Sequence, residues 1–239
     1  MHTATAFVIF GPSHLTVLAV IVLSAAALSV TARKRRGGNA SRDIAVCLAG
    51  LLVLNKVAVC ATIYATGEFD LPNALPMHLC DWSAIAAIIA LLWRKQLAYE
   101  LAYFWGLGGT LQATVTPDLH FDFPDIRFLT FFISHGGTLV AILFLTLGLR
   151  MRPWPVSLVR IFIWSNIYLA AAGTVDFLLG PNYGYLRSKP LNPSLLDYLG
   201  PWPLYILSLE GIALLSYVVY YTPFLIADLI KKKRAHTLV

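Results

Sequence analysis

Charged residues are scarce in this chain of 239 residues. They make up 13% of it, whereas about a quarter of the residues of a soluble domain are charged. Apolar residues account for 58%, and the mean hydropathy is +0.71. These values exclude an ordinary soluble domain. They predict an all-α, multi-pass protein of the cell membrane, with a single transmembrane domain over residues 1–239.

Several motifs of soluble enzymes are also absent. The sequence has no CxxC pair, Walker loop, GxGxxG or HExxH, and we expect no cofactor and no metal site. No basic segment precedes the first apolar run, so no cleaved signal peptide is expected. The three cysteines, Cys47, Cys60 and Cys80, are an odd number and two lie within apolar runs, which makes a disulfide framework unexpected.

The chain has instead a series of apolar runs, each of which can cross a bilayer that needs about 20 residues. Seven runs are found, at His14–Ala32, Ile44–Ala65, Met77–Trp93, Leu97–Thr116, Phe128–Leu149, Leu158–Leu179 and Leu204–Ile226. The third run is long enough only if it includes polar residues at its start. We therefore predict a helix from Met77, with Pro76 suited to its first position.

Basic residues are concentrated in alternate connections between these runs. Fourteen of them fall in segments 33–42, 94–95, 150–160 and 231–234. The other connections hold only Arg127, Arg187 and Lys189, beside six acidic residues. The positive-inside rule then predicts the N-terminus outside and the C-terminus in the cytoplasm. Because these basic clusters are interpreted as topology signals, membrane lipids are the expected partners and nucleic acid is not.

The stretch Leu71–Trp82, LPNALPMHLCDW, concentrates reactive side chains at the outer mouth of the third run. A helix that begins near Met77 places Cys80 in its first turn. Free N–H groups and the positive dipole end favour an anion there, so the thiol is predicted to ionise more easily. Asp81 follows His78 by three residues on the same helical face, either as a cap or as the partner of a base.

Ionisable side chains inside the runs are costly and usually face the protein interior or a wet cavity. Those in the predicted outer half are His14, Lys56, Cys80, Asp81, His135, Asp176 and Glu210. They predict one cavity that opens outward. Lys56 is expected to pair with Asp176 or Glu210, because an unpaired lysine is unstable at this depth. His14 has an alternative interpretation as an interfacial residue, and Asn55 as a link between helices.

Cys80 and His135 form the pair with a chemical rationale, since a thiol nucleophile needs a base to receive its proton. His135 lies about eight residues inside the fifth run, a depth of about 12 Å. The alternative is that both residues only pack. Cys80 is then a small buried side chain, and His135 lies where Gly136 and Gly137 let helices approach closely.

The longest outer connection, Gly180–Pro203, is rich in Gly, Pro, Tyr and Asn. Its 24 residues are many for an unstructured connection between helices. It is predicted to be a lid or a mobile segment.

Several motifs together carry a resemblance to a known family. They are His14 in the first run, LPMHLCD at Leu75–Asp81, TPDL at Thr116–Leu119, SHGG around His135, and NYGYLRSKP at Asn182–Pro190. With these the chain resembles the YwaF-like family of bacterial integral membrane proteins, which is related to a vertebrate transmembrane acyltransferase that remodels ether phospholipids. The likeness covers nearly the whole chain.

The resemblance implies a membrane-embedded lipid acyltransferase, in which Cys80 and His135 are the counterparts of a catalytic cysteine and histidine. The site would move an acyl chain to or from a phospholipid or lysolipid and would open to the outer leaflet. The predicted supporting or substrate-binding residues are His14, Lys56, His78, Asp81, Asp176, Asn182, Tyr183, Tyr185, Lys189 and Glu210.

Two other functions stay open from the residues alone. A metal-dependent membrane hydrolase would use imidazole and carboxylate groups, which suit zinc. Its ligands would be His14, His78, Asp81 and His135. The other alternative is a seven-helix transporter or receptor with no catalysis.

Overall fold

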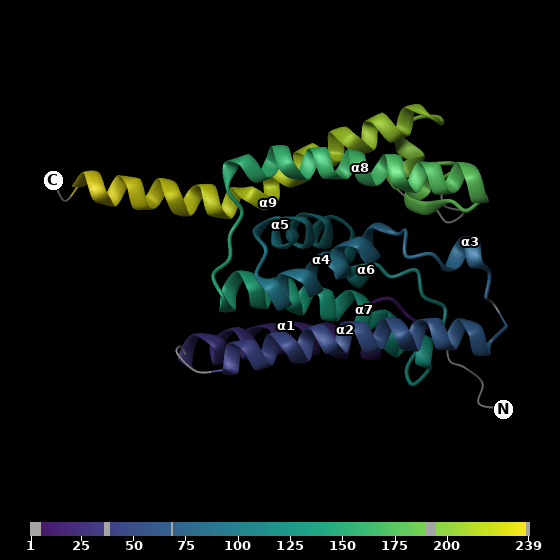
Figure 1. Ribbon diagram of the computed structural model, residues 1–239, viewed down its shortest axis with the longest axis horizontal. Helices are drawn as coiled ribbons and strands as arrows, with labels where there is room; N and C mark the ends of the chain where they lie inside the picture. Colours follow the sequence, from purple (N-terminus) through teal and green to yellow (C-terminus); the bar gives the residue numbers. More distant parts are fainter. Residues whose placement is uncertain (1–5, 36–38, 68, 190–194, 238–239) are drawn as a thin grey trace. The chain divides into compact units, whose positions relative to one another are not determined.

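The computed structural model describes residues 6–35, 39–67, 69–189 and 195–237, and Figure 1 shows their helices. The chain divides into two compact units, Met1–Met151 and Arg152–Val239. A single domain over residues 1–239 stays a prediction. The described residues contain helices and one isolated bridge between Ala6 and Phe121, but no β-sheet, so the all-α prediction is confirmed.

Among the described residues, the first unit contains five helical passages and one short helix. Its elements are α1 (Pro12–Lys34), α2 (Ala40–Ala65), α3 (Leu71–Ala74), α4 (Leu79–Trp93), α5 (Gln96–Trp105), the π-helix η1 (Gly106–Thr110), α6 (Leu111–Val115), α7 (Ile126–Leu143) and the π-helix η2 (Phe144–Gly148). Two of these passages are continuous across these labels, because α5, η1 and α6 follow one another without a break, as do α7 and η2. Pro12 starts α1, where its missing N–H costs nothing, and basic residues end it, where they complement the helix dipole.

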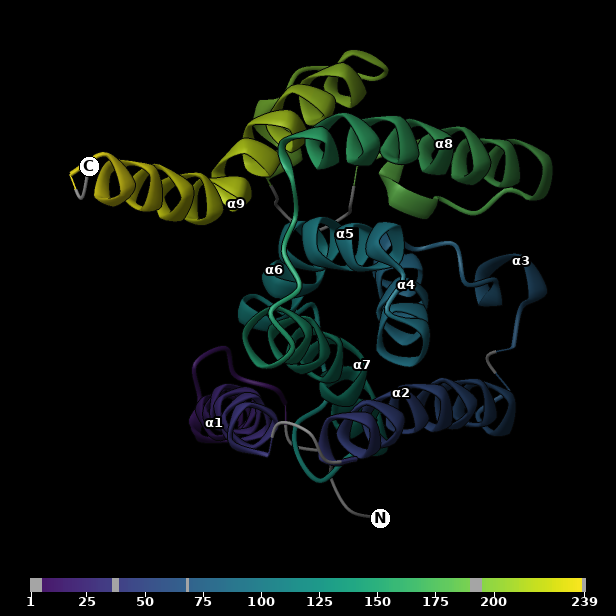
Figure 2. The same cartoon turned by 60° about the vertical axis from the view of Figure 1, so that its left-hand side comes forward.

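Helix α7 lies at the centre of this unit and contacts α1, α2, α4 and α6, as Figure 2 shows. Two glycines of α7 allow α1 and α2 to approach it closely. A Cβ added at Gly136 would lie 2.4 Å from Cδ1 of Ile21, and one at Gly137 would lie 3.2 Å from Cδ2 of Leu52. The two glycines of the SHGG motif thus let α1 and α2 pack directly against α7.

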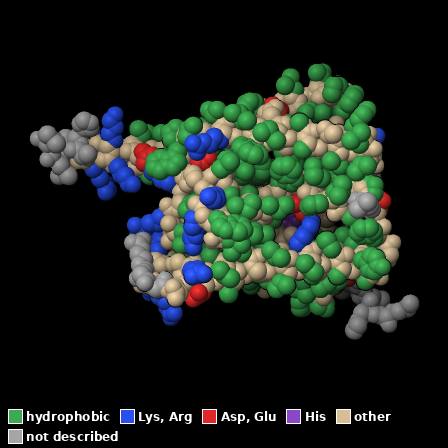
Figure 3. All heavy atoms as spheres, viewed as in Figure 1, with side chains coloured by type: hydrophobic (Ala, Val, Ile, Leu, Met, Phe, Trp, Pro, Cys, Tyr) green, Lys and Arg blue, Asp and Glu red, His purple; other side chains and the backbone are tan. Residues whose placement is uncertain are grey.

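The two ends of the first unit differ in charge. Arg33 at the end of α1 donates to the carbonyl oxygen of Leu147 at 2.6 Å, and Arg94 after α4 contacts that of Ser41 at 3.5 Å. The end of α1, the start of α2 and the turn after α4 therefore share one end of the unit. Figure 3 shows blue basic side chains gathered there, while hydrophobic side chains cover much of the viewed face. Which end faces the cytoplasm stays a prediction.

The second unit contains two long helices and the connection between them. They are α8 (Pro155–Leu179) and α9 (Leu204–Thr237), with the short 3-10 helices η3 (Tyr183–Tyr185) and η4 (Leu195–Tyr198) between them. Gly180 ends α8 with φ +99°, a left-handed conformation that favours glycine. Helix α9 contains Pro223, which accounts for the change of direction along α9 in Figure 1.

Five helices in the described residues are long and apolar enough to cross a membrane, which makes this a multi-pass membrane protein. They are Pro12–Lys34, Ala40–Ala65, Ile126–Gly148, Pro155–Leu179 and Leu204–Arg234. The other two predicted runs are not among these five, since α4 has only 15 residues and the continuous helix over 96–115 does not meet the same length and hydropathy limits. The seven-span count stays a prediction.

The predicted start of the third run at Met77 was wrong by two residues. His78 is the extended residue before α4, with φ −71° and ψ 148°, so the helix begins at Leu79. Leu75 is also extended, as expected for a residue before proline. Pro76 therefore does not occupy the first helical position. Cys80 and Asp81 still lie in the first turn of α4, as predicted.

Candidate functional site

An ion pair joins the start of α4 to the C-terminal half of α2. Nζ of Lys56 lies 2.6 Å from Oδ1 of Asp81, and the two side chains are 42% and 17% exposed. The prediction that Lys56 has a carboxylate partner is confirmed, but the predicted identity was wrong. The partner comes from the motif itself rather than from Asp176 or Glu210. Asp81 is therefore neither a simple helix cap nor reserved for His78.

This pair also sets the depth at which α4 begins. Lys56 precedes Ala65, the last residue of α2, by nine residues, which corresponds to about 13 Å along the helix. Asp81 in the first turn of α4 therefore meets α2 well before its last residue, and the non-helical residues 75–78 lead into that turn. Irregular backbone inside a membrane is tolerated only where it is buried in protein or lines a water-filled cavity.

His135 lies on α7 at a comparable depth, nine residues after Ile126. Its Nδ1 lies 3.0 Å from the carbonyl oxygen of Phe131. Because a carbonyl can only accept, Nδ1 carries the proton and Nε2 keeps a lone pair in the neutral ring. The ring stacks on Phe131 with centroids 4.3 Å apart. It also lies close enough to Asp81 and His78 to interact with their charges.

The thiol of Cys80 is half-buried beside the ion pair, whereas Cys47 and Cys60 are exposed. It interacts electrostatically with Asp81 and Lys56. The prediction of an easily ionised thiol rested on the helix end alone. It left out the burial of Cys80 and its charged neighbours Asp81 and Lys56, and it is not confirmed. Among the described residues, Cys80 and His135 share no direct hydrogen bond.

His14 belongs to a different cluster. It is fully buried. The backbone N–H of Phe10 donates to its Nδ1, and its Nε2 donates to the carbonyl oxygen of Thr114, both at 3.0 Å. The rings of Phe7 and Phe132 pack around it at 5.3 and 5.6 Å. Both ring nitrogens are used in joining α1 to the end of α6, so His14 has a structural role here.

The same geometry bears on the metal-dependent alternative. Within the described part of the chain, which includes all four predicted ligands, no group of three or more His, Cys, Asp or Glu side chains could hold a metal ion. A metal ligand needs a free lone pair, and the one on Nδ1 of His14 already accepts a hydrogen bond. No observation on these residues favours the metal-dependent hydrolase.

The predicted residues of the second unit organise the connection after α8. Asp176 is buried, and its Oδ1 accepts the backbone N–H of Tyr183 at 2.8 Å. Oδ1 of Asn182 accepts from the backbone of Arg187 and Ser188, at 2.9 and 3.2 Å. This polar network holds residues 180–188 as a compact turn.

Further contacts tie the same connection to the start of α9. The hydroxyl of Tyr205 donates to the carbonyl oxygen of Tyr185, and the ring of Tyr205 lies 5.5 Å from Nζ of Lys189. Nε1 of Trp202 donates to the carbonyl oxygen of Leu186 at 3.0 Å. These contacts hold the described parts of Gly180–Pro203 against α8 and the start of α9, whereas residues 190–194 lie outside the described residues. The lid or mobile segment stays a prediction. Glu210 is half-buried in α9.

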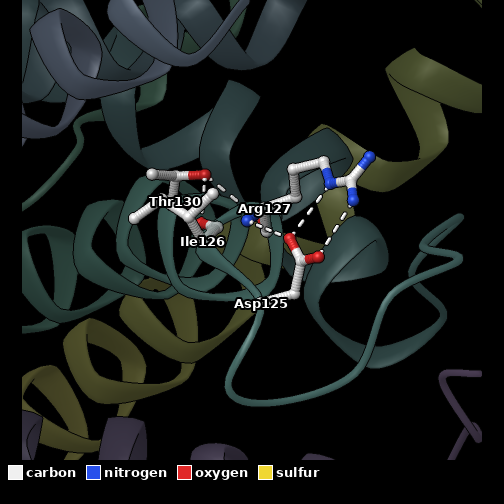
Figure 4. A network of polar contacts seen from close by, with 4 residues as sticks. All are labelled: Asp125, Ile126, Arg127 and Thr130. Atoms are coloured by element: carbon white, nitrogen blue, oxygen red, sulfur yellow. Dashed lines mark hydrogen bonds and ion pairs between the residues drawn. The ribbon is translucent and has the colours of Figure 1, made fainter. Parts of the chain in front are cut away.

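Two polar clusters were missed from the sequence. At the start of α7, Asp125 accepts from the backbone N–H and the guanidinium of Arg127, at 2.8 to 3.0 Å, as Figure 4 shows. Hydrogen bonds from Arg127 hold the pKa of the Asp125 carboxyl below its ordinary value. In the second unit, Arg152 donates to Asp228 at 2.7 Å. The spacing of Asp125 and Arg127 was a usable signal, whereas Arg152 and Asp228 are 76 positions apart.

Comparison with known proteins extends over most of the chain. Residues 9–221 match the model of the TMEM164 family, a vertebrate transmembrane family. An uncharacterized protein of Treponema pallidum (strain Nichols) is 26% identical over 219 residues, which cover 91% of this chain and 90% of that protein. No solved structure matches. The resemblance to the YwaF-like family stays a prediction.

Proposed function

Because the chain belongs to the TMEM164 family, we propose that it is a membrane-embedded acyltransferase that moves an acyl chain to or from a phospholipid or lysolipid. Cys80 is the nucleophile and His135 the base. One observation carries the proposal. Asp81, next to Cys80 in the first turn of α4, pairs with Lys56 of α2, and α4 packs against α7, which carries His135. This packing of the three helices supports a site that uses groups from each of them.

The orientation of His135 suits the role of base. Its Nδ1 proton is held by the carbonyl oxygen of Phe131, so the Nε2 lone pair is available to accept a proton. Asp81 is near enough to stabilise the imidazolium that then forms. Cys80 reaches Nε2 through a water or through a small shift when substrate binds, since catalytic hydrogen bonds are often long before that point.

The reaction proceeds in two halves. His135 takes the thiol proton of Cys80, and the sulfur attacks the carbonyl carbon of an acyl ester to give a tetrahedral anion. The ester C–O bond breaks, the leaving alcohol takes the proton from His135, and the chain stays on Cys80 as a thioester. A lysolipid hydroxyl or a water then gives its proton to His135 and attacks the thioester. The new ester or free acid leaves, and Cys80 regains its proton.

The proposal is tested by assaying transfer of a labelled acyl chain between phospholipid and lysolipid in membranes that contain the protein. Cys80→Ser and His135→Ala should each reduce turnover at least about a hundredfold, the range expected for loss of a nucleophile or general base. Mass spectrometry should find an acyl adduct on Cys80 that hydroxylamine removes. Cys60→Ser is the matched control and should leave turnover unchanged. Full turnover in Cys80→Ser would reject the nucleophile.

The topology proposed with this function has seven spans, with the N-terminus outside and the C-terminus in the cytoplasm of a cell membrane. The gathering of basic side chains at one end of the first unit supports it. Single cysteines placed at Ser188 and at Arg42, in a background without native cysteines, test it with a membrane-impermeant maleimide on intact cells. Only the cysteine at position 188 should react. The reverse pattern would invert the topology.

A further inference from the structure

Two consecutive residues of α2 hold two different helices. Nδ2 of Asn55 donates to the backbone carbonyl oxygen of Thr130 on α7 at 3.0 Å, and Asn55 is 5% exposed. Nζ of Lys56 lies 2.6 Å from Oδ1 of Asp81 on α4. Successive helical side chains point about 100° apart, so one level of α2 can reach two neighbours. Asn55 and Lys56 thus reach α7 and α4 from the same turn of α2.

Each contact is close in sequence to a reactive residue of the proposed function. Asp81 directly follows Cys80, and Thr130 precedes His135 by five residues on α7. The contact of Asn55 fixes how far α7 is displaced along α2. The contact of Lys56 fixes how far α4 is displaced along α2. Together they determine the separation of Cys80 from His135 along the membrane normal.

The link to α2 lies where α4 begins. The residues before it, 75–78, are not helical, and the preceding α3 has only four residues. The ion pair therefore adds a polar link, one residue from Cys80, to the packing of α4 against α2, α5 and α7. Displacement by about 1 Å at a reacting group can reduce the rate about a hundredfold. A fixed point next to Cys80 is therefore valuable for chemistry at this thiol.

We propose that Asn55 and Lys56 are positioning residues that use α2 as a common reference to hold Cys80 at the level of His135. The inference rests on the proposed function, because it assigns the contacts a purpose in bringing those two side chains together. Neither Asn55 nor Lys56 needs to contact the substrate.

The test measures the separation of residues 80 and 135 directly. In a Cys47→Ser, Cys60→Ser, His135→Cys variant kept in native membranes, bifunctional thiol reagents of graded length cross-link the two cysteines, and intact mass gives the yield. The shortest reagents should work. Adding Lys56→Met or Asn55→Leu should lower that yield about fivefold and favour longer reagents, because the helices lose their fixed level. Lys56→Arg should retain the yield.

Controls separate positioning from general damage. Arg42→Met removes an exposed basic side chain from the same helix and should leave the cross-linking pattern unchanged. If Lys56→Met does not accumulate, the charge reversal Lys56→Asp with Asp81→Lys replaces it and should restore short-reagent cross-linking. Unchanged cross-linking in Lys56→Met, or no recovery in the reversal, would overturn the inference alone. No short cross-link in the parent variant would overturn the proposed function as well.

Discussion

The polar side chains that the sequence analysis singled out are satisfied in different ways in the two units. In Met1–Met151, Asn55, Lys56 and His14 reach across from one helix to another. In Arg152–Val239, Asp176 and Asn182 instead bind the backbone of the connection that follows α8. Polar groups between packed helices fix relative depth, whereas those at a helix end shape a loop. The first arrangement suits a site that needs groups from several helices at one level.

Glycines show the same contrast. Gly136 in α7 is in van der Waals contact with α1, whereas a Cβ added at Gly211 in α9 would meet nothing within 4 Å. Close packing makes the contact of Gly136 with α1 sensitive to single atoms, whereas the open surface at Gly211 tolerates an added methyl group. The changes below test this contrast, from the largest expected effect to the smallest.

Replacement of Lys56 by methionine should have the largest effect. It leaves the Asp81 carboxylate, 17% exposed, without its cation. Breaking a buried pair costs about 3–5 kcal/mol. This pair is only partly buried, but Lys56 lies within the apolar helix Ala40–Ala65, so we expect a loss at or below the lower limit of that range. Thermal unfolding in detergent should show the loss, with Lys56→Arg close to the parent protein. Lys232→Met, at an exposed position of α9, should be neutral. Equal effects at positions 56 and 232 would contradict the structural importance of the pair.

Gly136→Ala should destabilise the protein by about 2 kcal/mol, the usual cost of overpacking. The added Cβ would lie 2.4 Å from Cδ1 of Ile21. Ile21→Val removes that carbon and should restore part of the loss. Gly211→Ala is the matched change in the other unit and should be neutral or stabilising by up to about 1 kcal/mol, from helix propensity. Paired thermal unfolding curves check this, and an equal loss at both glycines would remove the contrast.

Asp176→Leu should cost about 1–2 kcal/mol, because the backbone N–H of Tyr183 loses its acceptor. The turn over residues 180–188 should also become more accessible to added protease. Asp176→Asn keeps an acceptor oxygen and is the matched control, with a smaller effect on both measurements. If proteolysis is the same in both variants, the hydrogen bond does not hold the turn.

Asp125→Asn should have the smallest effect, about 0.5 kcal/mol at neutral pH, because the pair lies at the end of α7 rather than within a span, and surface pairs contribute little. Because Arg127 lowers the pKa of Asp125, the pair stabilises the fold above the ordinary carboxyl pKa of about 4, and this contribution is lost as the pH falls through the lower folded value. The difference in melting temperature between variant and parent should therefore shrink from pH 7 towards about pH 3. A difference that grows on acidification would contradict this sign.

Local features of the site followed from local sequence. The position of Cys80 in a first helical turn was predictable because Pro76 and the apolar residues after it restrict where a helix can start. The role of Asn55 as a link between helices was also anticipated, since a buried amide needs a partner. The first residue of α4 was missed by two positions, because helix ends depend on backbone angles that hydropathy does not register.

Composition and hydropathy by themselves determined that the chain is an all-helical membrane protein. Long apolar runs are suited to the lipid bilayer, where the backbone must pair its own polar groups within a helix. Only the tertiary structure decided which polar groups meet. Lys56 and Asp81 are 25 positions apart and His14 and Thr114 are 100 apart. Such pairings depend on helix displacement and rotation, set by close contacts such as Gly136 against Ile21. From the sequence, any carboxylate at a similar depth could have been the partner of Lys56. The packing of α2 against α4 determines that the partner is Asp81.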